Sequence, residues 1–498
     1  MVASESISIV LVAVVAFLTL IIWMVQRRPY RNLPPGPKGW PLVGCIPMLK
    51  SDLHLDLQDL GKGYKDIYSV YLGTRLNIIL SSHRAVRASL LKYGSVFADK
   101  PAEPHIEVVN PHFYGTIFGP YSEDWKMEKK FTIKALRSFG YGSTSIETNI
   151  QKEVTKLIEH FESLKGPHDI MKSVSIAMSN IMTLILFSRR YDYDDQGFLD
   201  ILQTIGKWME NTAKLQGDLN FFPLMGCLPW VLKRKKYTRH LNKKLHDFFR
   251  SHVEEHRATL VPGVTRDFVD TVLHEIGSDK MSSTLGYYSD DKFMYQLHSF
   301  FPDAVDTAPE SMRWLMLYTV YYPETQKKVQ AEIDDVIGHN RLPCLADRDA
   351  MPYTQATIME TLRFSGVVPI NPTHCCLEDT EVLGFTIPKN VDVIANLWAV
   401  HHDPEAWGDP EVFRPERFQD KEGHLISHEA YMPFSVGRRS CLGEQLAKKE
   451  FFLVYTSLLQ RFTFSFPKDR PLPSLKGEFG FTLRAKDYEL CVEKRTDL

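Results

Sequence analysis

The chain has 498 residues, of which 44% are hydrophobic and 24% are charged, a composition that supports a large folded core and excludes an intrinsically disordered protein. Lysine and arginine number 59 and aspartate and glutamate 61, giving a net charge of −2; this excludes a generally basic nucleic-acid-binding protein, and no nucleic-acid partner is expected. The seven cysteines are irregularly spaced without a Cys-x-x-Cys pair, so neither a zinc ribbon nor a disulfide framework is expected.

The N-terminal segment has the length of a membrane span. Residues 7–25 are uncharged, and a helix of that length covers about 28 Å, close to the thickness of the hydrocarbon layer. Arg27, Arg28 and Arg31 follow, and basic residues prefer the cytoplasmic side of a membrane. We therefore predict a signal-anchor transmembrane segment over residues 1–30, with the rest of the chain in the cytosol. A cleaved signal peptide is the alternative, but the segment lacks a basic start and a small-residue cleavage site.

Residues 31–44 form a proline-rich stretch with Pro34, Pro35, Pro37 and Pro41. Each proline fixes φ and removes a backbone donor, so no helix continues through this stretch. It is predicted to be a stiff hinge between the anchor and the body.

Residues 45–498 carry the periodicities of a single large domain, mainly α with a minor β part. Two β-prone runs at residues 67–72 and 76–80 flank Gly73 and predict a hairpin. Apolar residues recur at helical spacing over residues 146–161, 312–318, 354–362 and 446–459, and residues 391–395 read as extended. An apolar, proline-broken stretch at 221–232 precedes four basic residues, which suits a membrane surface; packing in the core is the alternative.

The most specific motif lies at residues 434–443, which read Phe-Ser-Val-Gly-Arg-Arg-Ser-Cys-Leu-Gly. A helical pattern starts directly after it, so Cys441 is expected at a helix N-terminus, where backbone N–H groups lower a thiol pKa and favour the thiolate. Glycines such as Gly437 let a large flat group approach the backbone, and Arg439 is a candidate partner for an anionic substituent of that group. An isolated cysteine of this kind is more often a buried structural thiol.

The whole decapeptide resembles the haem-binding motif Phe-x-x-Gly-x-Arg-x-Cys-x-Gly of the cytochrome P450 family at every fixed position. The resemblance is to the microsomal, drug- and lipid-oxidising branch, and it implies a cytochrome P450-type haem domain. Haem b (iron protoporphyrin IX) would be bound through the Cys441 thiolate, which donates electron density to the iron. Phe434, Gly437 and Arg439 would belong to the haem site.

Three further segments are similar to the family pattern. Glu360 and Arg363 share one helix face, and with Arg417 they match the family's buried triad, which implies structural support for the sulfur-bearing loop; an exposed salt bridge is the alternative. The segment from Trp125 to Lys129 matches the family's Trp-x-x-x-Arg, with lysine acting as a point charge instead of a planar fork. Two other residues fall at positions that bind haem propionates in many relatives; these are His374 and Lys100.

The expected oxygen-side helix departs from the family pattern. Residues 303–308 read Asp-Ala-Val-Asp-Thr-Ala, and the resemblance assigns the acid–alcohol pair Asp306 and Thr307 to catalytic proton delivery. Five positions differ from or interrupt the usual pattern, and each proline among them removes a helical hydrogen bond. They are Pro302, Asp303, Ala304, Ala308 and Pro309. Either the prolines exploit a bend in this helix, or the chemistry is altered.

The resemblance implies a haem-thiolate monooxygenase in the endoplasmic reticulum membrane that inserts one atom of dioxygen into a hydrophobic small molecule, such as a lipid, steroid, fatty acid or xenobiotic. Its implied partners are NADPH–cytochrome P450 reductase, cytochrome b5 as a second electron donor, and membrane lipid. A basic stripe is either a solvated face or the docking surface for the electron donor. The stripe consists of Lys126, Lys130, Lys134 and Arg137.

Two other functions remain open. The unusual helix over residues 302–309 suggests a haem-thiolate isomerase or lyase, which rearranges a peroxide and needs no reductase. A non-enzymatic, membrane-bound haem sensor or carrier is the second alternative, although such a protein has no need of the Thr307 hydroxyl.

Overall fold

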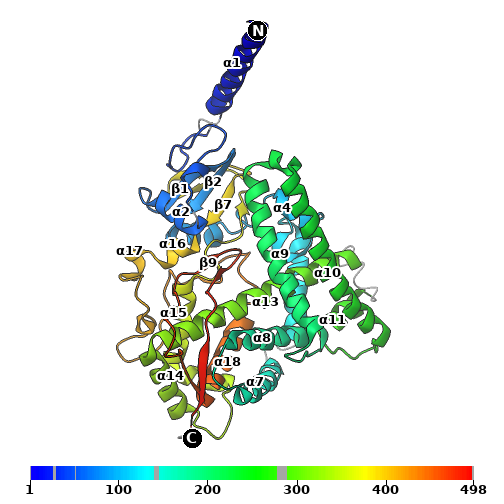
Figure 1. Ribbon diagram of the computed structural model, residues 1–498, viewed down its shortest axis with the longest axis vertical. Coiled ribbons are helices and arrows are strands. Elements are labelled where there is room, and N and C mark those ends of the chain that lie inside the picture. Colours follow the sequence, from blue (N-terminus) through cyan, green and yellow to red (C-terminus); the bar gives the residue numbers. More distant parts are fainter. Residues whose placement is uncertain (1, 26–29, 51, 139–144, 277–288, 496–498) are drawn as a thin grey trace.

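The computed structural model describes residues 2–25, 30–50, 52–138, 145–276 and 289–495. A single helix, α1 (Val2–Val25), projects from one end of a mostly helical body (Figure 1). The largest sheet lies at the end of the body that carries α1, and the long helices make up the rest. The predicted mainly α domain with a minor β part is confirmed.

The longer helices of the body are α2 (Leu53–Gly61), α6 (Glu123–Leu136), α7 (Ser145–Ser163), α8 (Ile170–Phe187), α9 (Gln196–Phe221), α10 (Pro229–Thr259), α11 (Phe268–Ile276), α13 (Asp290–Tyr321), α14 (Pro323–Val336), α15 (Pro352–Ser365) and α18 (Glu444–Arg461). Short helical turns connect them: η1 (Ile46–Met48), α3 (His83–Val86), the π-helical η2 (Arg87–Lys92), α4 (Pro104–Val109), α5 (Gly115–Phe118), η4 (Pro223–Cys227), η5 (Leu345–Ala350), α16 (Leu397–His401), α17 (Pro404–Trp407) and η6 (Pro415–Phe418).

The predicted hairpin is formed by β1 (Ile67–Leu72) and β2 (Arg75–Leu80), which pair antiparallel. β2 runs parallel to β7 (Asp392–Ala395), and β7 pairs antiparallel with β4 (His374–Cys375), which completes a sheet of order β1-β2-β7-β4. The remaining strands in the described ranges pair antiparallel in smaller sheets. These are β3 (Pro167–His168) with β11 (Leu490–Lys494) and β8 (Phe462–Ser465), β5 (Thr380–Val382) with β6 (Phe385–Ile387), and β9 (Glu478–Phe479) with β10 (Leu483–Arg484).

Helix α13 crosses the middle of the body and packs against α5, α8, α10 and α15. Its apolar residues Phe293, Leu297 and Phe301 recur every four positions and are fully buried, as expected for one apolar face of a helix. The Ser289 hydroxyl caps its start by accepting the Lys292 N–H at 3.2 Å. The helix continues through both internal prolines. Its neighbour α8 is apolar enough to cross a membrane, but most of it is buried in the body, so it is a core helix.

The described part of α1 carries apolar side chains that are largely exposed. Its large hydrophobic residues between Leu11 and Ile22 are mostly exposed, and the apolar stretch of its described part runs from Leu11 to Trp23. Exposed apolar surface of this extent marks a membrane or protein contact. Arg27 and Arg28, on which the predicted orientation depends, lie outside the described residues, whereas Arg31 is described and exposed.

The proline-rich stretch is docked on the sheet. The carbonyls of Pro34 and Pro35 accept hydrogen bonds from the hydroxyl and the N–H of Ser69 in β1, at 2.8 and 2.9 Å. Gly36 lies so close to this strand that a Cβ would stand 1.7 Å from the Ser69 carbonyl oxygen. Part of the predicted stiff hinge is therefore hydrogen-bonded to the sheet, because prolines lose their donor but keep a carbonyl that can accept.

The connection between α9 and α10, together with the first turn of α10, exposes several apolar side chains. Leu224, Trp230 and Leu232 are 90%, 55% and 51% exposed, and the basic residues Lys233 and Lys236 beside them are also exposed. Val231 of the same stretch is fully buried, with Met225 and Leu228 packed against its cluster. The stretch therefore divides between core packing and an exposed apolar surface that suits a membrane.

Candidate functional site

Cys441 lies in a loop that leads into the N-terminus of α18. We call residues 432–443 the sulfur loop. The Cys441 N–H donates to the Phe434 carbonyl at 3.0 Å, which closes the loop on itself. Gly437 has φ of +85°, and a Cβ at this position would stand 1.8 Å from the Leu90 carbonyl oxygen, so the loop requires glycine here. Cys441 is exposed as a residue. Nearby protein atoms nevertheless reduce the contact of its thiol with water.

The protonation state of Cys441 differs from the prediction. Burial raises the pKa of its thiol to about 11, whereas the backbone N–H groups of Gly443 and Glu444 lower it and the charge of Asp303 raises it further. The predicted low thiol pKa is therefore wrong for the polypeptide alone, because desolvation outweighs the N–H groups at the helix start. A metal ion at the sulfur would reverse this balance, since a coordinating thiol loses its proton.

Arg439 is partly buried and has no carboxylate partner within 4.0 Å among the described residues. Its guanidinium donates to the carbonyls of Ala98, Thr116 and Gly119 at 2.7, 2.9 and 2.6 Å, and it forms no ion pair with the residues that the structure describes. It lies 3.9 Å from the centre of the Trp125 ring, which is itself fixed by an indole N–H donated to Thr116 at 2.9 Å. Trp125 and Arg439 thus form one layer beside the sulfur loop.

Two lysines add to this positive cluster. Lys129 donates to the Arg438 carbonyl, and Lys100 donates to the carbonyls of Pro372 and Thr373 at 2.9 and 3.0 Å. Burial and the neighbouring Arg439 lower the pKa of Lys100 to about 7 and lower that of Lys129. Burial also lowers the pKa of Arg439 to about 10.

Partial burial of Lys100, Lys129 and Arg439 without an anion disfavours their charged forms. An anionic group beside them would favour the charged forms again. A flat cofactor with two carboxylate substituents meets this requirement. The exposed Cys441, the close approach of the loop backbone at Gly437 and the neighbouring cations therefore fit haem.

Both ring nitrogens of His374 lie within hydrogen-bond distance of protein groups. Its Nδ1 lies 2.7 Å from the Phe97 carbonyl and its Nε2 lies 2.9 Å from the Asn371 side-chain amide. Burial holds its pKa well below the usual value, so the ring is neutral, and both nitrogens are already engaged by protein groups. The Asn371 amide also donates to the Ser435 hydroxyl at 3.1 Å. Through Asn371, His374 is connected to the sulfur loop, and its contact with a haem propionate stays a prediction. Asn371 lies outside the sequence motifs, whereas Ser435 occupies a variable position of the motif at residues 434–443.

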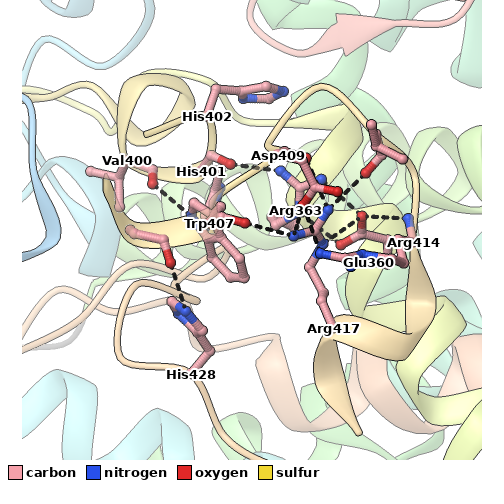
Figure 2. Close-up of polar contacts among 12 residues, drawn as sticks. Glu360, Arg363, Val400, His401, His402, Trp407, Asp409, Arg414, Arg417 and His428 are labelled. Carbon is pink, nitrogen blue, oxygen red and sulfur yellow. Dashed lines mark hydrogen bonds and ion pairs between the residues drawn. The ribbon is translucent and has the colours of Figure 1, made fainter. Parts of the chain in front are cut away.

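The structure brings the three residues of the predicted triad together in the interior (Figure 2). Arg363 donates twice to the Glu360 carboxylate, at 2.7 and 2.8 Å, and Arg417 donates to the same carboxylate at 3.0 Å. The side chains of Glu360, Arg363 and Arg417 are 0%, 0% and 4% exposed. This burial excludes the alternative of a solvated surface salt bridge.

The triad is connected to the sulfur loop by hydrogen bonds. Arg363 donates to the His401 carbonyl at 2.7 Å (Figure 2). The His401 ring accepts the Met432 N–H at 3.1 Å, at the start of the loop. Arg417 donates to the carbonyls of Trp407 and Val412 at 3.0 and 2.8 Å. The triad therefore fixes the backbone that carries the loop.

On α13, the predicted acid Asp306 and alcohol Thr307 bond to different partners. The carboxylate of Asp306 accepts a hydrogen bond from Thr482 at 2.9 Å and forms an ion pair with Arg484, so both of its oxygens are committed to the C-terminal segment. The Thr307 hydroxyl donates to the Asp303 carbonyl at 2.8 Å. A distant segment thus supplies Asp306 with partners that the local motif does not contain, and its part with Thr307 in proton delivery stays a prediction.

Comparison with known proteins agrees with this geometry. The cytochrome P450 family profile matches residues 34–492. Cytochrome P450 2U1 of Mus musculus is 34% identical over 97% of this chain and 95% of its own length. Cytochrome P450 2J2 of Homo sapiens is 35% identical over 97% of this chain and 95% of its own length, and cytochrome P450 18a1 of Drosophila melanogaster is 31% identical over 99% and 93%. The chain therefore belongs to the cytochrome P450 family, whose members are monooxygenases that bind haem b through a cysteine thiolate.

Proposed function

We propose that this protein is a membrane-anchored monooxygenase in which Cys441 is the haem ligand. The reaction consumes one hydrophobic substrate, dioxygen, NADPH and a proton, and it gives the hydroxylated substrate, water and NADP⁺. The observation that carries the proposal is the exposed Cys441 beside cations that form no ion pair with the residues that the structure describes. When bound, the haem supplies the iron centre at which dioxygen is reduced and one oxygen atom is transferred.

The chain's own residues bind and orient the cofactor. Arg439, Lys129 and Lys100 neutralise its two carboxylates, and the Trp125 ring packs against the Arg439 guanidinium. The Thr307 hydroxyl, on the α13 turn that follows Asp303, holds a proton at its Oγ1 for transfer to the reacting oxygen.

The membrane contact rests on two apolar surfaces. The exposed side chains of α1 and those at Leu224, Trp230 and Leu232 would lie in the endoplasmic reticulum bilayer, with the basic residues beside them at the headgroups. NADPH–cytochrome P450 reductase would deliver electrons from the cytosolic side, with cytochrome b5 as a second donor.

The function is tested by turnover of the full-length protein in phospholipid vesicles with and without NADPH and the reductase. Dodecanoic acid and testosterone serve as probes for the lipid and steroid classes. We expect a hydroxylated product only with NADPH and reductase, carrying one ¹⁸O atom from ¹⁸O₂.

An isomerase or lyase is the second candidate, favoured by the commitment of Asp306 to Arg484 and Thr482. Conversion of a lipid hydroperoxide without reductase, together with no NADPH-dependent product, would establish it and overturn the monooxygenase proposal.

The basic stripe on α6 gives a further prediction. Lys130 and Lys134 are exposed and form no ion pair with the described residues. Reversal of both charges, Lys130→Glu with Lys134→Glu, should slow reduction by the reductase by about tenfold at low ionic strength, because steering by charge is lost. The difference should shrink at high salt, and haem content should not change.

The matched control for the stripe reverses the charges of two exposed lysines beside β3 and β8, in the variant Lys165→Glu with Lys468→Glu. It should be reduced at the wild-type rate. Equal rates for the stripe variant and this control in stopped-flow reduction would exclude the stripe as a docking surface.

A further inference from the structure

An open groove lies between α10 and α4, and it shares no lining residue with the sulfur loop or with the cations beside it. Its volume is about 670 Å³, which is in the range of small-molecule sites. One wall is a polar face of α10, whose members recur at helical spacing. They are Lys235, Arg239, Asn242, Lys243, His246 and Arg250.

The groove carries an excess of positive charge. Of its four cations, only Lys243 is paired with a carboxylate of the described residues, at 2.6 Å from Asp247. The other three share the groove with one unpaired carboxylate, that of Glu107 on α4. Arg239 stands one helical turn from Lys235 and one from Lys243, and its planar guanidinium suits two-point binding of a phosphate.

Two buried polar atoms of the groove have no hydrogen-bond partner within the described ranges. They are Asn242 Oδ1 and His246 Nε2. The Asn242 amide nitrogen donates to the Val109 carbonyl at 3.1 Å, which fixes the side chain. Burial, with the charge of Arg250, lowers the pKa of His246 to about 4, so its ring is neutral. An amide oxygen and a neutral imidazole both bond hydroxyl groups, and leaving them unpaired is unfavourable.

One end of the groove adjoins the exposed apolar surface of the α9–α10 connection. Pro223 lines the groove, and the neighbouring Leu224 is 90% exposed. A Cβ at Gly73, in the β1–β2 turn, would stand 2.2 Å from the Phe221 carbonyl oxygen. The connection therefore lies against the largest sheet, at the end of the body that carries α1 (Figure 1). A lipid at this surface can reach the groove with its headgroup.

We propose that the groove binds the headgroup of an anionic phospholipid that carries hydroxyl groups, as phosphatidylinositol does. The phosphate lies at Arg239, where it accepts charge-assisted hydrogen bonds, and Lys235 adds a point charge. The hydroxyl groups bond Asn242 and His246, and the acyl chains extend toward the exposed apolar side chains at Leu224. The inference rests on the membrane contact of the proposed function and is independent of the haem.

The test is isothermal titration calorimetry of the full-length protein in a neutral detergent with dioctanoyl lipids. Phosphatidylinositol carries a net charge and hydroxyl groups, phosphatidylserine carries the same net charge without hydroxyl groups, and phosphatidylcholine is neutral. The groove variant is Lys235→Gln with Arg239→Gln. The control, Lys233→Gln with Lys236→Gln, removes two exposed charges from the same helix outside the groove lining. Haem content reports that each variant is folded.

We expect phosphatidylinositol to bind wild type and the control equally, and the groove variant about tenfold more weakly, because the phosphate loses charge-assisted hydrogen bonds. Phosphatidylserine should bind wild type more weakly than phosphatidylinositol, and phosphatidylcholine more weakly still. Equal affinity of wild type and the groove variant for phosphatidylinositol, an equal loss in the control, or equal binding of phosphatidylinositol and phosphatidylserine would overturn the inference.

Glycerophosphoinositol, the same headgroup without acyl chains, separates a lipid from a soluble phosphate ester. It should bind wild type more weakly than the lipid does. Equal affinity would assign the groove to a soluble phosphate ester and overturn the lipid assignment. The thiolate-type band of the reduced carbon monoxide complex reports the proposed function separately, so the two failures are distinguishable.

Discussion

Replacement of Glu360 by alanine is expected to abolish accumulation of folded, haem-loaded protein. The change leaves Arg363 and Arg417, which are 0% and 4% exposed, without the carboxylate that they share. Loss of one partner from a buried ion pair costs about 3–5 kcal/mol, because the remaining charge stays desolvated. Total stabilities of proteins are about 5–15 kcal/mol, so this single change removes a large fraction of the free energy of unfolding.

The milder variant Glu360→Gln keeps the fold testable. Its amide can still accept a hydrogen bond, but it cannot neutralise two guanidinium groups, so we expect a lower melting temperature and weaker haem retention. The control is Glu416→Gln in η6, next to Arg417, whose carboxylate forms an exposed ion pair with Lys328 at 2.7 Å. Exposed pairs contribute at most about 1 kcal/mol. Equal melting temperatures for Glu360→Gln and Glu416→Gln would show that the triad does not support the loop.

The triad is connected to the sulfur loop through His401. Arg363 reaches the sulfur loop by way of the His401 carbonyl and the bond from the Met432 N–H to the His401 ring. Loss of the triad should therefore displace the loop before it unfolds the distant helices. The role is structural, because all three side chains are buried and bonded to one another and to backbone carbonyls.

The elements that depend on near neighbours were predictable from the sequence. The β1–β2 hairpin and the helices α7, α15 and α18 follow from alternation or helical periodicity within one segment. Glu360 and Arg363 stand three residues apart, which places them on one face of α15. Arg417 is 57 residues further on, and only the resemblance to a family connected it with them.

The contacts between distant segments were not predictable. Asp306 is bonded to Thr482 and Arg484, which lie 176 and 178 residues away in the chain and belong to no motif. The contact of Ser69 with the proline-rich stretch and the contact of Asn371 with Ser435 are of the same kind. The predicted direction of the Cys441 thiol pKa was wrong for a related reason. The start of the helix can be read from the sequence, whereas burial depends on the whole fold.

Cys441→Ser is expected to have the second large effect. A serine hydroxyl is not a thiolate, so iron would lose its sulfur ligand and the electron density that thiolate provides. We expect NADPH-dependent turnover to fall to the background while the fold persists, since Cys441 contributes only its backbone N–H to the closure of the loop. The matched control is Cys227→Ser, which changes an exposed cysteine outside the site and should leave turnover unchanged.

The reduced carbon monoxide spectrum of the purified, full-length protein tests the central claim most directly. Thiolate ligation gives a Soret band at markedly longer wavelength than ligation by histidine or water. The account predicts this band for wild type and for Cys227→Ser, and its loss in Cys441→Ser. A wild-type protein without the band, or a Cys441→Ser variant that retains it, would contradict the assignment of Cys441 as the ligand.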